Sequence, residues 1–210
     1  MSLTSELKRG LDALELSVSQ DAQAKLLQHL ELIEKWNRVY NLTAVRDRNQ
    51  MLAQHVLDSM AVLPHIAGAT LIDVGSGAGL PGIPLAIARP DTHVTLLEAN
   101  HKKSTFLKQA VIELGLANAE VVNARAEAWT PPAPYDVVIS RAFSDLGEFV
   151  ALAGRLCGDE GVLAAMKGVY PFEELAQVSE PYRTAAVIPL SVPTLNAERH
   201  LVVIERQKSA

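Results

Sequence analysis

The pattern of apolar and polar positions changes character near residue 68. Before that point the apolar residues recur at helical spacing, and Ser19 is placed to cap the first predicted helix. A second helix is predicted over residues 49–63, with Pro64 marking its end. The apolar stripes of the two helices consist of Leu26, Leu27, Leu30 and Ile33 in the first and Leu52, Val56, Met60 and Leu63 in the second.

After residue 68 short apolar, β-branched runs appear, each followed by a stretch predicted as helical. The runs cover residues 70–74, 94–97, 120–122, 135–139 and 161–166. They do not alternate with polar residues, which is typical of parallel strands covered by helices on both faces. Two later runs, 185–188 and 200–204, have no room for a helix between them and predict a hairpin. The sequence therefore predicts an N-terminal helical extension (1–67) and a doubly wound α/β domain (68–210), whose mostly parallel sheet ends in an antiparallel strand.

The most informative segment is the glycine-rich turn Asp73–Gly82, which follows the first strand directly. Glycines there allow a tight turn and leave bare backbone against which a ligand can lie. Two cofactor spacings fit. Gly77, Gly79 and Gly82 match the nicotinamide pattern G-x-G-x-x-G, whereas Gly75, Gly77 and Gly79 match the S-adenosylmethionine pattern G-x-G-x-G after an acidic residue. Because Gly75 abuts the strand, the methyltransferase spacing is favoured, and a nicotinamide-dependent oxidoreductase is the alternative.

Further candidate cofactor residues follow the next strands of the predicted sheet. Glu98 ends the second strand, about 20 positions after the glycines, where an acidic residue typically binds the ribose hydroxyls. Both cofactor classes use such a residue. In methyltransferase folds the turn after the third strand lies beside the adenine, so Ala126 and Glu127 are candidates there.

The turn after the fourth strand, Ser140-Arg141-Ala142-Phe143, offers no proton acceptor and no nucleophile. The Asn/Asp-Pro-Pro-aromatic motif of enzymes that methylate exocyclic amines is absent from it. The single cysteine, Cys157, is predicted to lie in a helix as a small core residue. Ring N7 of guanine needs no deprotonation, so direct in-line displacement fits this site. Arg141 is then the expected catalytic residue, acting by positioning with its planar fork.

Composition limits the partners. The 210 residues carry a formal net charge of -5, so any nucleic acid must be bound by a local basic patch. Lys102, Arg125 and Lys167 all follow predicted strand ends and are the candidates for contact with RNA. One cysteine excludes an internal disulfide, and no metal site is expected. No apolar run approaches the roughly 20 residues of a membrane span, so we expect a cytoplasmic protein without membrane contact.

Several short motifs in a fixed order carry a resemblance to a known family. They are Trp36-Asn37, Asn41-Leu42-Thr43, His55-Val56-Leu57-Asp58-Ser59, the glycine turn, Glu98, His101-Lys102-Lys103, Ser140-Arg141-Ala142-Phe143, Lys167-Gly168 and Glu198-Arg199-His200. With these motifs the chain resembles the small-subunit ribosomal RNA guanine-N7 methyltransferases, also called glucose-inhibited division protein B. The resemblance implies methylation of N7 of G527, in the 530 loop of 16S ribosomal RNA, with S-adenosylmethionine as cofactor.

The resemblance also implies roles for single residues. Gly75, Leu80, Ala126, Glu127 and Arg141 would contact the cofactor, and Arg125, Arg141 and Lys167 would meet RNA or the target base. The expected partner is 16S ribosomal RNA within the small subunit, bound by a monomer. A non-catalytic RNA-binding or ribosome assembly factor is a further alternative. His55, Asp58 and Ser59 share one face of the predicted second helix; they either cover the cofactor cleft or form an ion pair in water.

Overall fold

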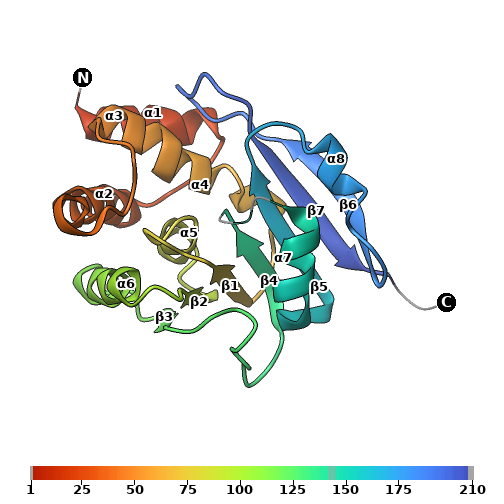
Figure 1. The fold of residues 1–210 in the computed structure, drawn as a ribbon. Coiled ribbons are helices and arrows are strands. Elements are labelled where there is room, and N and C mark those ends of the chain that lie inside the picture. Colours follow the sequence, from red (N-terminus) through yellow and green to blue (C-terminus); the bar gives the residue numbers. More distant parts are fainter. Residues whose placement is uncertain (1, 142, 144, 208–210) are drawn as a thin grey trace.

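In a computed structural model, which describes residues 2–141, 143 and 145–207, the described strands form one sheet. The order across the sheet is β3-β2-β1-β4-β5-β7-β6 (Figure 1). The strands are β1 (Thr70–Val74), β2 (His93–Leu97), β3 (Ala119–Val122), β4 (Tyr135–Ser140), β5 (Cys157–Lys167), β6 (Tyr182–Pro189) and β7 (His200–Arg206).

Strand direction places the candidate site residues at one edge of the sheet. Strands β1 to β5 are mutually parallel, so their carboxyl ends lie at the same edge. Strand β7 runs antiparallel to β5, and its first residue, His200, pairs with Lys167 at the end of β5. The beginning of β7 therefore lies at the same edge as the ends of β1 to β5. Strands β6 and β7 form the predicted hairpin, and the predicted fold class is confirmed.

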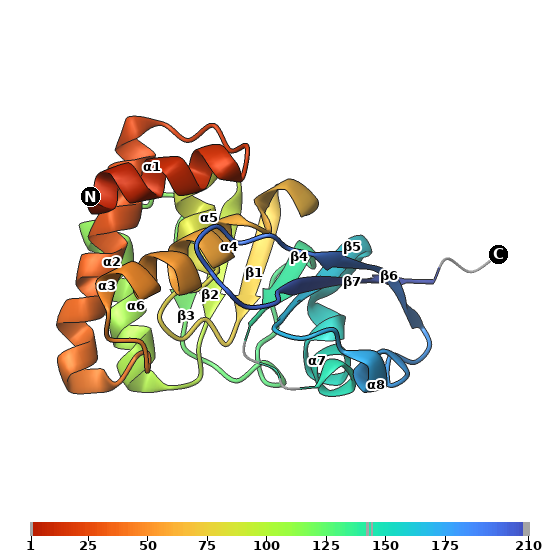
Figure 2. The same ribbon diagram turned by 90° about the horizontal axis from the view of Figure 1, so that it is seen from above.

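The helices form two unequal layers on the sheet (Figure 2). One core cluster joins the N-terminal helices, α5 and α6 to one face, and a second cluster joins α7 to the other face. None of the described helices combines the length and apolar character needed to cross a bilayer. The helices are α1 (Leu3–Ala13), α2 (Gln20–Tyr40), α3 (Arg48–Met51), α4 (Asp58–Met60), α5 (Gly82–Ala88), α6 (His101–Glu113), α7 (Leu146–Ala153) and α8 (Phe172–Leu175), with a π-helical segment at Leu52–Leu57 and 3₁₀ turns at Leu63–His65 and Gly154–Leu156.

The N-terminal helices follow the predicted stripes, with one change of geometry. Ser19 caps α2 by accepting a hydrogen bond from the Ala22 amide, and the predicted stripe of that helix is buried except for the half-buried Leu27. The second predicted helix is continuous through α3, the π-helical segment and α4, and it ends at Met60. Its central turn is wider than an α-helical turn. The wider turn lies directly before Asp58, the first residue of α4.

Two expectations about the α/β part are wrong. Cys157 does not lie in a helix but begins β5, because the 3₁₀ turn before it ends the helical run at Leu156. It is nonetheless a small core residue, and burial raises the pKa of its thiol to about 11. The segment after β3 is the second error. Residues 123–134 form turns with no helix before β4 begins.

His29 on α2 joins the helical layer to the glycine-rich turn. Its side chain is fully buried, and Nε2 donates a hydrogen bond to the Ala78 carbonyl at 2.9 Å. Burial lowers the pKa of His29 to about 4, so the ring is neutral at neutral pH. The contact holds the middle of the turn from the side of the N-terminal helices.

His29 should make folding sensitive to acid. The folded state binds the proton less readily than the unfolded state, so the contribution of His29 to stability is present above pH 6.5 and is lost as the pH falls toward 4. That loss reaches about 3 kcal/mol. In His29→Gln, the unfolding free energy should depend less steeply on pH in this range, by up to about 1.4 kcal/mol per pH unit. Urea unfolding of both proteins at each pH measures the difference, and parallel curves would contradict the assignment.

Candidate functional site

The turn after β1 takes a backbone path that only glycine adopts freely. Gly75, Gly77 and Gly79 have φ values of 75°, 57° and 79°. In this region other L-residues cost roughly 1–2 kcal/mol each. Two carboxylates hold the turn: Asp73 Oδ2 accepts from the Gly82 amide at 2.9 Å, and Glu98 Oε2 accepts from the Gly77 amide at 2.8 Å. The loop is thus fixed at its centre and at its end before any ligand binds.

Asp73 lies beneath the turn and not in the cavity above it. Its side chain is fully buried, and burial raises the pKa of the carboxyl to about 7, although the hydrogen bonds from Gly82 and Ser76 oppose that rise. Gly82 packs against it so closely that an added Cβ would lie 2.7 Å from Asp73 Oδ2. The acidic residue before the glycines therefore shapes the loop.

A cavity of about 150 Å³ lies above the glycines, lined by Leu42, Thr43, Gly75, Ser76, Gly77, Ala78, Leu80 and Arg141. An added Cβ on Gly77 would meet only the Gly75 carbonyl oxygen, 3.8 Å away, so the space over the loop is open. The volume is below the roughly 300–1,000 Å³ of complete ligand pockets. The cavity therefore has room for part of an adenosyl-methionine-sized molecule.

Glu98 and the turn after β3 lie together further along the edge. Glu98 is buried, with 7% of its surface exposed, so it is not a solvated charge at a strand end. Its backbone carbonyl accepts from Asn123 Nδ2 at 2.7 Å, which brings the turn after β3 next to β2. The Ala126 carbonyl accepts from Arg155, whereas the Glu127 side chain is exposed and lies 3.7 Å from Arg125. The structure thus places the predicted ribose residue beside the predicted adenine turn.

Arg141 joins this cavity to a second one. The second cavity, of about 350 Å³, is lined by Gln54, His55, Asp58, Arg141, Met166, Lys167, Gly168 and Arg199. Arg141 Nη1 donates to the Gln54 carbonyl at 3.0 Å and lies 3.4 Å from Asp58 Oδ2. The guanidinium group is therefore fixed between the two cavities. Ala142, which follows it in the predicted motif, lies outside the described residues.

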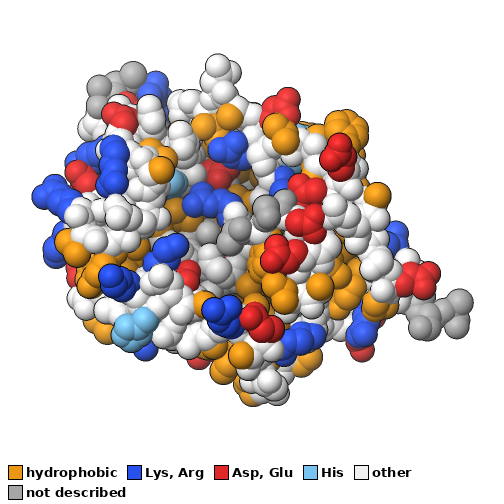
Figure 3. Space-filling view, viewed as in Figure 1, with side chains coloured by type: hydrophobic (Ala, Val, Ile, Leu, Met, Phe, Trp, Pro, Cys, Tyr) orange, Lys and Arg blue, Asp and Glu red, His pale blue; other side chains and the backbone are white. Residues whose placement is uncertain are grey.

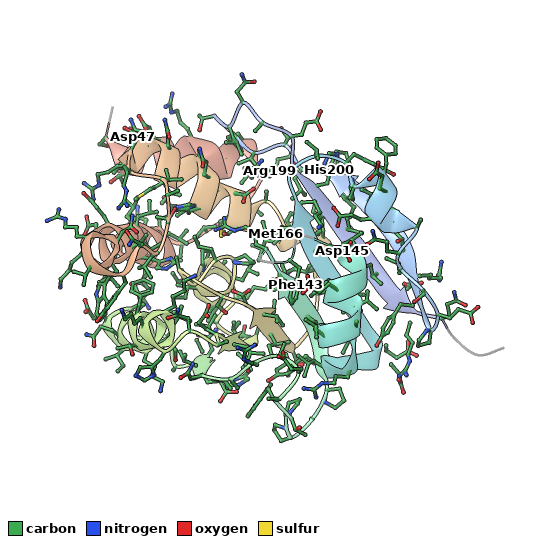
Figure 4. The ribbon with its side chains drawn as sticks, viewed as in Figure 1. Asp47, Phe143, Asp145, Met166, Arg199 and His200 are labelled. Atoms are coloured by element: carbon green, nitrogen blue, oxygen red, sulfur yellow. The ribbon has the colours of Figure 1, made fainter. Side chains whose placement is uncertain are left out.

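Asp58 and Arg199 are site residues to which the sequence analysis assigned no firm role. Arg199 Nε donates to Asp58 Oδ1 at 3.0 Å, and only 2% of the Asp58 side chain is exposed. Figure 4 shows Arg199 and Met166 on the border between the N-terminal helices and the β5–β7 part of the sheet. The sequence signal that could have placed Arg199 in the site was the predicted antiparallel last strand. The beginning of that strand lies at the edge of the sheet where Lys167 ends β5.

The structure distinguishes the two alternatives for the helix face that carries His55, Asp58 and Ser59. His55 and Asp58 both line the second cavity, whereas the Ser59 hydroxyl donates to the His55 carbonyl at 2.5 Å. An ion pair in water is excluded, because all three side chains are buried. His55 Nε2 lies 2.9 Å from Thr43 Oγ1, and burial lowers the pKa of His55 to about 4. His55 is therefore neutral at neutral pH.

The three predicted RNA contacts differ in exposure. Lys102 in the first turn of α6 is exposed, and the Arg125 side chain is 77% exposed. The Lys167 side chain is only 9% exposed and pairs with Glu174 at 2.5 Å. On the face in Figure 3, Lys and Arg gather over the N-terminal helices and α6, and acidic side chains gather over α7 and α8. One half of this face thus suits a polyanion despite the negative net charge.

Comparison with known proteins identifies the family. The model of the GidB family, described as rRNA small subunit methyltransferase G, matches residues 22–202. The chain belongs to the GidB family. It is 57% identical over 213 residues to the ribosomal RNA small subunit methyltransferase G of Nitrosospira multiformis, covering 98% of this chain and 99% of that one. The protein of that name from Laribacter hongkongensis is 58% identical over 202 residues, covering 96% and 98%.

A solved structure agrees with the fold. The S-adenosylmethionine-dependent methyltransferase from Aquifex aeolicus superposes with a TM-score of 0.59 at 19% identity, covering 74% of this chain and 92% of that one. The predicted methyltransferase fold and the resemblance to the GidB family are thereby confirmed. The family is one of ribosomal RNA methyltransferases, which favours the G-x-G-x-G spacing over the nicotinamide alternative.

The glycines of the GidB turn should differ in their tolerance of alanine. Gly77→Ala meets open space and should lower the unfolding free energy by about 1–2 kcal/mol, the cost of a left-handed alanine. Gly79→Ala adds the same strain and an overlap with Ile83 Cδ1, so it should cost about 1–3 kcal/mol more. Thermal or urea unfolding ranks the two variants. Equal losses would show that the space over Gly77 is not open in solution.

Proposed function

We propose that this chain transfers the methyl group of S-adenosylmethionine to N7 of G527 in the 530 loop of 16S ribosomal RNA. The reaction is a direct displacement. The N7 lone pair forms the new bond to the methyl carbon while the sulfur–carbon bond breaks, which yields a cationic N7-methylguanine and neutral S-adenosylhomocysteine. No proton has to leave the nucleophile. Membership of the GidB family supports the methyl transfer to ribosomal RNA.

The residues of the first cavity fit this cofactor. When bound, S-adenosylmethionine supplies a methyl group on a sulfonium that departs as a neutral thioether. Gly75 and Gly77 offer bare backbone and Leu80 an apolar wall. Glu98 lies beside this lining, where it accepts from the Gly77 amide, and would supply a carboxylate for the ribose hydroxyls. The turn containing Ala126 and Glu127, brought close by Asn123, is the proposed adenine side.

The observation that carries the choice of N7 is the lack of a suitable base among the described residues that line the two cavities. Both carboxylate oxygens of Asp58 face arginines. His55, with its pKa lowered to about 4, is a weak proton acceptor at neutral pH. An exocyclic amine or a hydroxyl would need such an acceptor, whereas a ring nitrogen with a free lone pair needs only alignment. Orientation alone supplies up to about 7–11 kcal/mol of barrier reduction.

The second cavity is the proposed place for the target nucleotide. Arg141 lines both cavities and would hold the base in line with the methyl group, which is its catalytic role. Arg199 and Lys167 add positive charge at the same cavity, and Lys102 and Arg125 would contact phosphates outside it. We expect a monomer acting on the small ribosomal subunit in the cytoplasm.

The decisive experiment maps the methyl group. Purified protein is incubated with labelled S-adenosylmethionine and small subunits from a bacterial strain lacking this methyltransferase. The expected result is one labelled guanine in the 530 loop that is cleaved at N7-methylguanine by borohydride and aniline. Label at another atom would contradict the N7 proposal, and binding of subunits without any label would favour the assembly-factor alternative.

Gly75→Asp tests the cofactor cavity. Aspartate tolerates the left-handed conformation better than most residues, so the variant should fold, but its side chain would enter the cavity. Saturating S-adenosylhomocysteine should raise the melting temperature of the unmodified chain by about 5–10 °C and that of the variant hardly at all. Asp136→Asn, at the opposite edge of the sheet, is the control and should keep the full shift. An equal shift in Gly75→Asp would place the cofactor elsewhere.

A further inference from the structure

The second cavity is held together by one buried carboxylate. Asp58 is the first residue of α4, directly after the π-helical segment, and only 2% of its side chain is exposed. Its two oxygens face two guanidinium groups that arrive from different strands. Oδ1 accepts from Arg199, just before β7, and Oδ2 lies 3.4 Å from Arg141, just after β4. The carboxylate therefore joins three segments that are far apart in the sequence.

The arginines are more exposed than the carboxylate that holds them. Their side chains are 30% exposed for Arg141 and 23% for Arg199, and both line the cavity. A guanidinium group on a long side chain has many rotamers, and fixing it costs conformational entropy. A second constraint acts on Arg141, because the Gln54 carbonyl in the π-helical segment also accepts from Nη1. The N-terminal helices thus determine where both cations point.

We propose that Asp58 is a positioning residue for methyl transfer, which orients Arg141 and Arg199 toward the target nucleotide. This inference rests on the proposed function of the second cavity. Asp58 offsets one of the two guanidinium charges, so the pair keeps a net positive charge. Arg199 Nη1 also donates to the Glu198 carbonyl and Arg141 Nη1 to the Gln54 carbonyl, so a nucleotide phosphate or guanine O6 would be bound by the remaining guanidinium N–H groups. The chemistry that the pair recognises is therefore an anionic or strongly accepting group on the target nucleotide.

The loop next to the cofactor cavity supports this reading. Thr43 lines the first cavity and contacts His55 Nε2 at 2.9 Å, while His55 lines the second cavity with Asp58. Asn37 on α2 fixes Thr43 through two backbone hydrogen bonds of 3.0 Å. The N-terminal helices thus contribute walls to both cavities, and Asp58 is their ionic contact with the sheet edge there.

Asp58→Asn is the main test. The amide keeps the size of the side chain and one acceptor oxygen, but its NH₂ group would face a guanidinium, so one arginine must turn away. Because misplacement by about 1 Å can cost 10²-fold, we expect kcat for total methyl incorporation into small subunits to fall about 10- to 100-fold. The KM for S-adenosylmethionine should change much less than kcat, because the variant leaves the glycine loop intact and the Gln54 carbonyl still holds Arg141.

The control is Asp136→Asn. Asp136 is the second residue of β4, at the other end of that strand, where its carboxylate accepts from the Ala69 and Thr70 amides at 2.8 and 2.9 Å. This variant makes the same chemical change at a carboxylate that also joins distant segments, and it should destabilise the fold without changing kcat. All rates are compared below the melting temperature of the least stable variant. If Asp58→Asn lost no more activity than Asp136→Asn, the role of Asp58 would be purely structural.

A double-mutant cycle adds a second measurement. Arg199→Gln leaves Asp58 paired with Arg141, so the variant should fold even if Asp58→Asn does not, and its kcat should fall by a similar factor. Because Asp58 also orients Arg141, Asp58→Asn should slow the Arg199→Gln variant further, but by a smaller factor than it slows the unmodified chain. Multiplying losses would overturn the positioning role. The assay counts methyl incorporation at any atom of the RNA. A target other than N7 would therefore refute the proposed function, whereas the comparison of rates among the variants would still test the role of Asp58. No transfer by the unmodified chain would refute both proposals.

Discussion

Three hydrogen bonds made by buried side chains hold the glycine-rich turn, and the site is built around that turn. Asp73 fixes the end of the turn by accepting from the Gly82 amide, and Glu98 fixes its centre by accepting from the Gly77 amide. His29 donates to the Ala78 carbonyl. The three side chains come from β1, from the end of β2 and from α2. Because each is buried, breaking any of these contacts would leave a polar group without water. A loop of left-handed glycines, flexible in isolation, is thereby made rigid before a ligand arrives.

The N-terminal helices are part of the site as well as part of the core. They share one apolar cluster with α5, α6 and the adjoining face of the sheet. Thr43 lines the first cavity, and Asp58 contacts the arginines of the second cavity. The π-helical segment lies directly before Asp58, and its Gln54 carbonyl accepts from Arg141 beside this carboxylate. The proposed catalysis by positioning depends on such fixed walls, since the described residues that line the two cavities include no suitable base.

Sequence patterns predicted the elements better than their details. The strand–helix alternation predicted a mostly parallel sheet, and the site depends on this because the carboxyl ends of parallel strands meet at one edge. The order of the strands across the sheet was not predicted. The Cys157 assignment failed because an apolar run next to a glycine has no periodicity that separates a helix end from a strand start. Lys167 was correctly placed at the edge, but its pairing with Glu174 on α8 depends on a later segment folding back over it.

The residues alone determined the fold class, the glycine turn and the acidic residue at the end of β2, because each follows from local spacing along one or two adjacent elements. Tertiary structure alone decided that Asp58, Arg141 and Arg199 meet. Arg141 follows Asp58 by 83 positions in the sequence, and Arg199 follows it by 141. No periodicity encodes a contact of that range. It arises when an antiparallel last strand begins at the edge where the parallel strands end, and when the N-terminal helices pack across that edge.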